Sequence, residues 1–76
     1  MKIFDEYKIS DWAHGMCIKK DEEKYWRLIT DSWCICWYCI DIKDRKELWN
    51  LITDSDYAFR YCHDVMDREE VRKYIK

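Results

Sequence analysis

The chain repeats itself at an interval of 23 residues. When residues 20–42 are laid over residues 43–65 without a gap, 11 of the 23 positions carry the same amino acid. The identical pairs include Asp21 and Asp44, Trp26 and Trp49, Tyr38 and Tyr61, and Cys39 and Cys62. A unit this short cannot bury a hydrophobic core alone, so its copies must stack on one another. The interval therefore predicts an array of small stacked units.

Two partial copies flank the full ones. The C-terminal segment matches the first half of a unit, with Ile75 in the place of Ile52. The N-terminal segment is a degenerate copy that matches the second half of a unit at an interval of 22. Degenerate copies are common at the ends of repeat arrays. We therefore expect one domain over residues 1–76, divided into copies at 1–19, 20–42, 43–65 and 66–76.

The apolar spacing within a unit favours helices. Residues 57–65 place apolar side chains at i, i+1, i+4, i+5 and i+8, which is one face of a helix. Residues 33–40 alone are typical of a buried strand, because aromatic and β-branched residues crowd them. Their repeat partner is helical, however, and both copies share one register. The predicted fold class is all-α, with tandem short helix pairs packed as a small solenoid or bundle.

Polar residues mark where the helices should begin. Asp44 with Glu47, and Asp67 with Glu70, have the spacing of an N-terminal capping box. Serines stand where the other helices should start, at Ser10, Ser32 and Ser55. These signals predict about seven short helices, at residues 3–9, 11–19, 22–29, 33–42, 45–52, 56–65 and 68–75.

The order of residues from Trp49 to Val71 is similar to a known kind of array. An isoleucine is followed by an aspartate-containing turn, then by alanine and tyrosine on the next helix, and then by arginine and glutamate. This order resembles the short α-helical repeat arrays of uncharacterised bacterial and phage proteins. The chain departs from that pattern at positions 34–37 and lacks the glycine and proline that often separate such units. The resemblance implies a helical fold and no catalytic residues.

Five cysteines invite a metal-binding interpretation, since three of them form the motif Cys34-x-Cys36-x-x-Cys39. Clustered thiolates are good zinc ligands, so a small zinc module using these three and a histidine is one alternative. The repeat favours another interpretation, because Cys17, Cys39 and Cys62 occupy equivalent positions and free cysteine packs as a small hydrophobic residue. We therefore expect buried, reduced thiols and no metal or cofactor.

The histidines and the paired acidic residues do not suggest catalysis. His14 and His63 should lie beside the core stripe, on the helix surface. His63 and Asp64 are adjacent, and neighbours in a helix point about 100° apart, so a catalytic pair is not expected. No serine, cysteine or carboxylate recurs at a spacing that assembles a nucleophile with its base. The chain is therefore not expected to be an enzyme.

The two full copies differ most along one helix face. Residues Trp33, Cys36, Trp37 and Ile40 form a second apolar stripe, whereas the next copy has Asp56, Phe59, Arg60 and His63 at those positions. The apolar helix is either the buried centre of the array or a surface bearing aromatic anchors. The residues expected to bind a partner are Trp33, Trp37, Ile40, Phe59 and Arg60.

The charge balance bears on the type of partner. The chain has 14 basic and 16 acidic residues and a net charge of −2, whereas nucleic-acid binders usually carry a basic excess. A nucleic-acid-associated helical repeat remains an alternative if one edge gathers the basic side chains, which are Lys43, Arg45, Lys46, Arg60, Arg68, Arg72 and Lys73. Self-association is also open.

No segment of the sequence suggests a membrane or a secretory route. The longest apolar run, residues 33–40, is far shorter than the roughly 20 residues of a membrane-spanning helix. Asp5 and Glu6 stand where a secretory signal carries apolar residues. We therefore expect a cytoplasmic, non-catalytic protein-binding module. By association with phage arrays, the specific hypothesis is a small phage-encoded inhibitor of a host defence complex, such as an anti-CRISPR protein.

Overall fold

Six helices make up the part of the chain that the computed structural model describes, which is residues 2–76, with side chains from residue 7 onward. Three helices are long, namely α1 (Lys2–Lys19), α3 (Ser32–Asp41) and α5 (Ser55–Asp64). Three are single turns, namely α2 (Glu23–Trp26), α4 (Lys46–Trp49) and α6 (Glu69–Arg72). No strand occurs in residues 2–76, so the predicted all-α class is confirmed.

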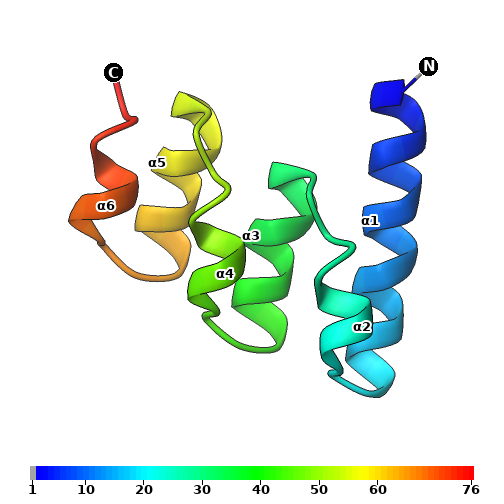
Figure 1. Ribbon diagram of the computed structural model, residues 1–76. Coiled ribbons are helices and arrows are strands. Elements are labelled where there is room, and N and C mark those ends of the chain that lie inside the picture. The colour runs from blue at the N-terminus through cyan, green and yellow to red at the C-terminus, as the bar shows by residue number, and fades with distance from the viewer. Residues whose placement is uncertain (1) are drawn as a thin grey trace.

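The long helices stand in a row, with α3 between α1 and α5, and one short helix packs beside each of them (Figure 1). The molecule measures 31 × 28 × 16 Å. Packed helix axes lie about 8–10 Å apart, and each backbone adds a radius of about 2.3 Å on either side. The 16 Å dimension therefore holds two layers of helices. One face of the long-helix row is left without a covering layer.

Aspartates cap two of the long helices. The side chain of Asp31 accepts hydrogen bonds from the backbone N–H groups of Trp33 and Cys34, at 3.1 and 3.4 Å. Asp54 caps α5 in the same way. Two of the serines predicted as helix starts, Ser32 and Ser55, are thus the first helical residues, each directly after its capping aspartate. Two of the predicted helix positions, 33–42 and 56–65, are otherwise correct to within one residue.

The prediction of separate helices at 3–9 and 11–19 is wrong, because α1 is continuous from Lys2 to Lys19. Position 9 is Ile9, where the other copies have a capping aspartate, so nothing starts a new helix there. Ser10 is buried inside α1, and its hydroxyl accepts hydrogen bonds from the backbone N–H groups of Thr30 and Asp31. The serine therefore ties the next loop to α1.

The predicted capping boxes are also wrong. The residues that precede α4 and α6 are Arg45 and Arg68, and neither makes a side-chain capping bond. The short helices last one turn and then continue in three-residue turns, such as the bond from the Leu51 N–H group to the Leu48 carbonyl oxygen. They are therefore shorter than the predicted 22–29, 45–52 and 68–75.

Asp44 has a different task from the one predicted. The hydroxyl of Tyr61 donates to Asp44 Oδ1 at 2.5 Å and accepts from Arg68 Nε at 2.8 Å. The guanidinium of Arg68 also bonds Asp44 Oδ2 and lies 4.8 Å from the Trp49 ring centroid. We call this group the Asp44 bridge. It ties three segments together, because Asp44 precedes α4, Tyr61 lies in α5 and Arg68 precedes α6.

The same arrangement occurs one interval earlier. Tyr38 donates to Asp21 Oδ1 at 2.6 Å and accepts from Arg45 Nε at 2.9 Å, and Arg45 lies 4.4 Å from the Trp26 ring centroid. We call this group the Asp21 bridge. Both tyrosines are fully buried, and burial together with the bond to aspartate raises the pKa of Tyr38 and Tyr61. Residues 23 apart therefore have the same contacts.

Apolar residues from all six helices and their loops form one core. The buried apolar side chains are Ala13, Cys17, Trp26, Ile29, Cys34, Ile35, Cys36, Tyr38, Cys39, Leu48, Trp49, Ile52, Ala58, Tyr61 and Val71. Cys17 and Cys39 are buried as their repeat position predicts, whereas Cys62 is only half-buried. The Cys62 thiol lies 3.8 Å from the carbonyl oxygen of Arg68, in the segment that precedes α6.

Candidate functional site

Large apolar side chains remain on the uncovered face of α3. Trp33 is 38% exposed, Trp37 is 39% exposed and Ile40 is 42% exposed. Their spacing of three and four residues places them on one side of the helix. With Arg60 of the neighbouring helix α5, we call these residues the aromatic face. It lies on the middle helix of the row, where a partner can reach both neighbouring helices.

The two tryptophans are held by ring contacts. Their ring centroids lie 6.0 Å apart at an interplanar angle of 63°. Trp33 also meets the Tyr57 ring edge-on at 6.2 Å, and the Arg60 guanidinium lies 5.4 Å from the Trp33 ring centroid. Arg60 is paired in turn with Asp64 at 4.0 Å. The aromatic face is thus built by two helices and is ordered before any partner arrives.

The sequence left open whether the apolar helix, now α3, is the buried centre of the array or a surface with aromatic anchors. Each interpretation describes one side of α3. Cys36 is buried against α5, with its thiol 3.7 Å from the Tyr57 carbonyl oxygen. Trp33 and Trp37, on the neighbouring side of the helix, are exposed. The helix is therefore both the centre of the row and the bearer of surface aromatic residues.

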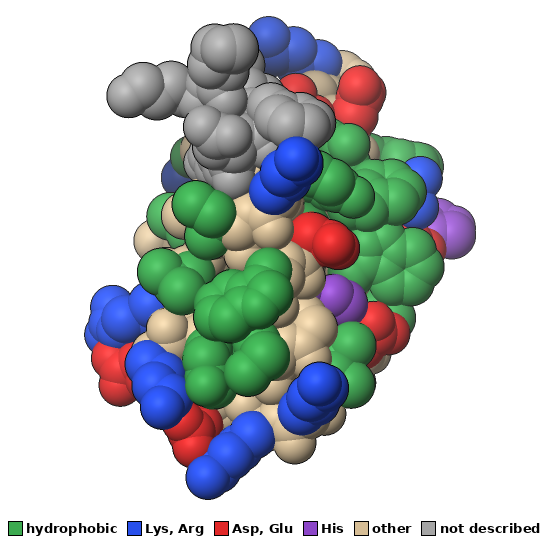
Figure 2. Space-filling view, turned by 90° about the vertical axis from the view of Figure 1, so that its right-hand side faces the viewer, with side chains coloured by type: hydrophobic (Ala, Val, Ile, Leu, Met, Phe, Trp, Pro, Cys, Tyr) green, Lys and Arg blue, Asp and Glu red, His purple; other side chains and the backbone are tan. Residues whose placement is uncertain are grey.

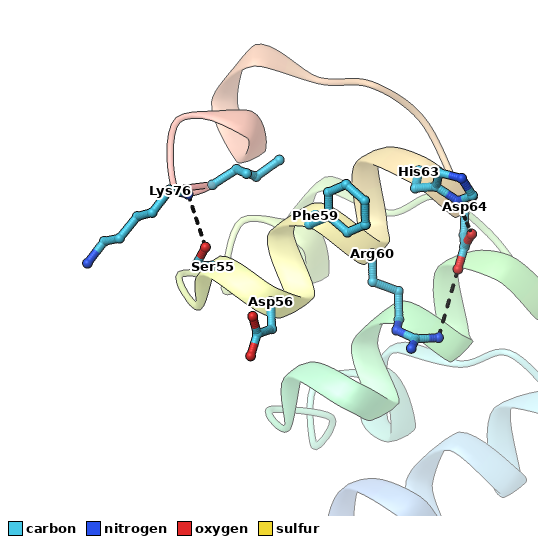
Figure 3. Close-up of a pocket in the computed structure, with 8 residues that line it drawn as sticks. Ser55, Asp56, Phe59, Arg60, His63, Asp64 and Lys76 are labelled. Atoms are coloured by element: carbon cyan, nitrogen blue, oxygen red, sulfur yellow. Dashed lines mark hydrogen bonds and ion pairs between the residues drawn. The ribbon is translucent and has the colours of Figure 1, made fainter.

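Phe59 lies apart from the aromatic face, in a groove at the C-terminal end of the row. The groove has a volume of about 560 Å³, and its lining includes Ser55, Asp56, Phe59, His63, Ile75 and Lys76 (Figure 3). Phe59 is 58% exposed and stacks on the His63 ring at 5.9 Å. Arg60 belongs to both the aromatic face and the groove. Its guanidinium lies over the Trp33 ring, and the residue also lines the groove.

A third apolar surface lies at the α1 end. Figure 2 shows hydrophobic side chains gathered on this end, with basic side chains around them. Trp12 is 54% exposed and meets the Tyr25 ring edge-on at 5.9 Å. Trp12 is thus an exposed tryptophan that contacts another aromatic ring and lies on α1, far from α5. Its replacement is a matched control for substitutions in the aromatic face.

The cysteine cluster does not converge on one point. Cys34 and Cys36 are two residues apart in a helix, so their side chains point about 160° apart. Burial raises the pKa of Cys34 and Cys36 to about 12, which disfavours the thiolate form that zinc requires. Within the described residues, no group of three or more histidine, cysteine or acidic side chains is placed to hold a metal ion.

We predict that the native chain has one readily modified thiol. Burial raises the pKa of Cys17 and Cys39 to about 11, and both lie in the core with Cys34 and Cys36, whereas Cys62 is partly accessible. Alkylation at pH 8 should label Cys62 at least about 100-fold faster than the other four. Mass spectrometry of a time course measures this ratio. Equal labelling of Cys39 and Cys62 would contradict the core assignment.

The histidines differ in their surroundings. His63 is exposed as predicted, yet its Nδ1 lies 2.8 Å from Asp64 Oδ1. Neighbours in a helix point about 100° apart, yet these two side chains meet at the helix surface. His14 is largely covered, with Nε2 3.4 Å from Asp41 Oδ2 on α3. It therefore belongs to the contact between α1 and α3 rather than to the open surface.

Most of the basic residues proposed for a nucleic-acid edge have acidic partners. Arg45 and Arg68 are in the two bridges, and Arg60 pairs with Asp64. Arg72 lies 3.6 Å from Asp67. Because each paired guanidinium faces a carboxylate, these positions do not form the open basic stripe that phosphate binding requires.

Two features of the surface were not predicted. Tyr57 supports Trp33, and Ser55 and Ile75 help to line the groove. The position of Tyr57 could have been predicted from helical spacing. Tyr57, Arg60 and Asp64 stand at i, i+3 and i+7, so they share the side of α5 that faces α3. The groove had no local signal, since its lining comes from α5 and from the last two residues of the chain.

The chain stands apart from known proteins in the comparisons. No family model, curated protein or solved structure matches it. Within the described residues, no helix combines the length and apolarity needed to cross a membrane.

Proposed function

We propose that the chain is a non-catalytic protein-binding module, built as a small array of stacked helical repeats. The repeat interpretation is supported by the Asp21 and Asp44 bridges, which make the same contacts one interval of 23 residues apart. Stacked helical units form extended surfaces suited to recognition. The aromatic face is the contact surface of the module.

The observation that carries this proposal is the exposed, ordered tryptophan pair. Tryptophan and arginine are the residues most enriched among the anchors of protein interfaces. Trp33 is fixed between Trp37, Tyr57 and Arg60, so little side-chain freedom is lost when a partner covers it. The exposed part of this aromatic pair is apolar area that a partner protein can cover.

The partner class follows from the resemblance and from the composition. Likeness to phage repeat arrays supports a small phage-encoded inhibitor of a host defence complex, and an anti-CRISPR protein is the specific form of this proposal. All five cysteines are free, which fits a reducing compartment. The proposal therefore includes a cytoplasmic location.

The test is a double substitution, Trp33→Ala with Trp37→Ala. Wild-type chain captures its partner from a lysate, the partner is purified, and both proteins are titrated by calorimetry. Losing an anchor of this kind costs more than about 2 kcal/mol of binding. We therefore expect affinity to fall at least about 30-fold.

The control is Trp12→Ala, which removes an exposed tryptophan from the α1 end. Its binding should match wild type. Melting curves accompany both variants and should show folded protein at the assay temperature. Full binding by the double variant would contradict the proposal, as would an equal loss on changing Trp12.

A further inference from the structure

Four arginines in the described part of the chain lie over a tryptophan ring. They are Arg27, Arg45, Arg60 and Arg68, and each guanidinium carbon lies 4.4–5.4 Å from a ring centroid. The ring attracts the positive charge of the guanidinium. The N–H groups at the guanidinium edge stay available for a hydrogen-bond acceptor. Each of these arginines can therefore contact a tryptophan and a carboxylate at once.

Three of these four arginines bind a carboxylate directly. Arg45 Nη2 lies 3.1 Å from Asp21 Oδ2. Arg68 Nη2 lies 2.5 Å from Asp44 Oδ2. Arg27 donates through Nε to the carboxylate of the glutamate four residues earlier. The chain thus builds the combination of tryptophan, arginine and carboxylate three times from its own residues.

Arg60 lies over the Trp33 ring but has no carboxylate at bonding distance among the described side chains. Its closest carboxylate is that of Asp64, with Arg60 Nη1 4.0 Å from Asp64 Oδ2. A hydrogen bond from nitrogen to oxygen spans about 2.7–3.2 Å, so this contact is too long to be one. The other oxygen of Asp64 lies 2.8 Å from His63 Nδ1. Asp64 is therefore engaged by the histidine, and the acceptor position of Arg60 is open.

The open position adjoins exposed apolar surface. Figure 3 shows the Arg60 side chain directed away from Phe59. The Arg60 side chain is 47% exposed, against 18% for Arg45 and 28% for Arg68. Trp37 and Ile40 expose apolar area on the same face. A partner that covers this area also excludes water from the guanidinium, which strengthens a bond from Arg60 to a partner carboxylate.

We propose that the aromatic face recognises a partner segment that presents one carboxylate beside apolar side chains. The carboxylate of an aspartate or a glutamate accepts two parallel bonds from Arg60, and the apolar side chains cover Trp33 and Trp37. Because α5 also carries Asp56 and Asp64, a single acid fits this surface better than a run of acids. The inference rests on the proposed function, since it names the chemistry of the partner that binds the same face.

The probe for the test is a library of short random peptides displayed on filamentous phage. The library is selected on folded full-length chain, and the enriched peptides are synthesised with a fluorescein label. Fluorescence anisotropy then measures their affinity. Peptides that Trp33→Ala with Trp37→Ala no longer binds are those that use the aromatic face. We expect each of these peptides to carry an aspartate or a glutamate next to an apolar residue.

A double-mutant cycle locates the carboxylate in the complex. Replacing the peptide acid by its amide should weaken binding about 10- to 100-fold, because a charge-assisted bond is lost. Arg60→Gln should weaken binding of the acidic peptide by the same factor, and it should bind the acidic and the amide peptides equally. Arg27→Gln is the matched control, since it removes another exposed arginine that lies over a tryptophan, and it should bind as wild type. Melting curves confirm that each variant is folded.

Asp64→Asn tests the sign of the partner's charge. An incoming carboxylate would lie near Asp64, so removal of this negative charge should strengthen binding of the acidic peptide about 2- to 5-fold. A partner segment that presents a cation would bind this variant more weakly than wild type. The direction of the change therefore distinguishes an acidic partner segment from a basic one.

Three results would overturn the inference. The first is that the peptides lost on changing Trp33 and Trp37 carry no acid, or carry lysine or arginine in its place. The second is an acidic peptide that Arg60→Gln binds as tightly as wild type does. The third is weaker binding of that peptide by Asp64→Asn. If no selected peptide depends on the two tryptophans, the proposed function itself is contradicted, so the two failures are distinguishable.

Discussion

Tyr61→Ala is expected to remove most of the chain's stability at 25 °C. The ring is fully buried beside Trp49, and its hydroxyl joins Asp44 to Arg68. Truncating a buried aromatic residue costs about 3–5 kcal/mol, and the two charged partners lose a bond in addition. A domain of this length has a total stability of about 4–11 kcal/mol. Far-UV circular dichroism and urea denaturation measure the loss.

Tyr61→Phe separates the ring from the hydroxyl. The phenylalanine keeps the packing but leaves Asp44 and Arg68 without their common partner, which should cost about 1–3 kcal/mol. In a chain of this size, each 1 kcal/mol lowers the melting temperature by about 4–8 °C. The equivalent change Tyr38→Phe breaks the Asp21 bridge and should have a similar effect. If a phenylalanine variant has the same melting temperature as wild type, the hydrogen bonds of the bridge add nothing to stability.

The long helices were predictable because their signals are local. The apolar spacing of residues 57–65, together with the matching register of 34–42, was sufficient to place α3 and α5 within one residue. The break expected near Ser10 was not found, because the capping aspartate at that position is replaced by Ile9. A helix continues where nothing competes with its backbone hydrogen bonds, and a serine alone is too weak to end it.

The role of Asp44 could not be predicted from spacing alone. Asp44 and Glu47 have the spacing of a capping box, yet the carboxylate binds side chains 17 and 24 residues away, which are Tyr61 and Arg68. The residue that directly precedes α4 is Arg45, so Asp44 stands one position too early to cap the helix, and its carboxylate binds the tyrosine and the arginine instead. The repeat itself held the signal, because aspartate and tyrosine are the same in both copies.

The presence of exposed aromatic residues could be predicted from the sequence, but their division between the aromatic face and the groove could not. Trp33 and Trp37 were recognised because the two copies disagree there, and a difference between repeats marks a position that stacking does not fix. The sequence predicted one partner-binding surface for Phe59 and Arg60, because they are adjacent. About 100° of helix rotation places Phe59 in the groove and turns Arg60 toward Trp33. The surface to which each residue belongs depends on which other segment packs against that side of α5, and local sequence does not give this.

Alkaline unfolding is the second large effect that we expect. Burial raises the pKa of four thiols, those of Cys34 and Cys36 to about 12 and those of Cys17 and Cys39 to about 11. In the unfolded chain a thiol has a pKa of about 8.5. The folded state therefore keeps its thiol protons to higher pH, and the stability from these groups is complete below about pH 8.5 and decreases up to pH 11–12.

The size of the effect follows from proton linkage. Between pH 9 and 10.5, each buried thiol should lower the free energy of unfolding by about 1.4 kcal/mol per pH unit. The four thiols together should lower the free energy of unfolding by about 5 kcal/mol per pH unit, so the chain should unfold near pH 10 in the presence of a reducing agent. Circular dichroism during a pH titration measures the midpoint, and urea denaturation at each pH measures the slope.

A cysteine variant tests whether the thiols cause this unfolding. Cys17→Ala removes one of the four groups, so the slope between pH 9 and 10.5 should fall by about a quarter, although the variant starts from a lower stability at pH 7 because packing is lost. Cys62→Ala is the matched control, since it removes a thiol that is only half-buried. Equal slopes in wild type and Cys17→Ala would mean that other groups, such as the bridge tyrosines, unfold the chain at high pH.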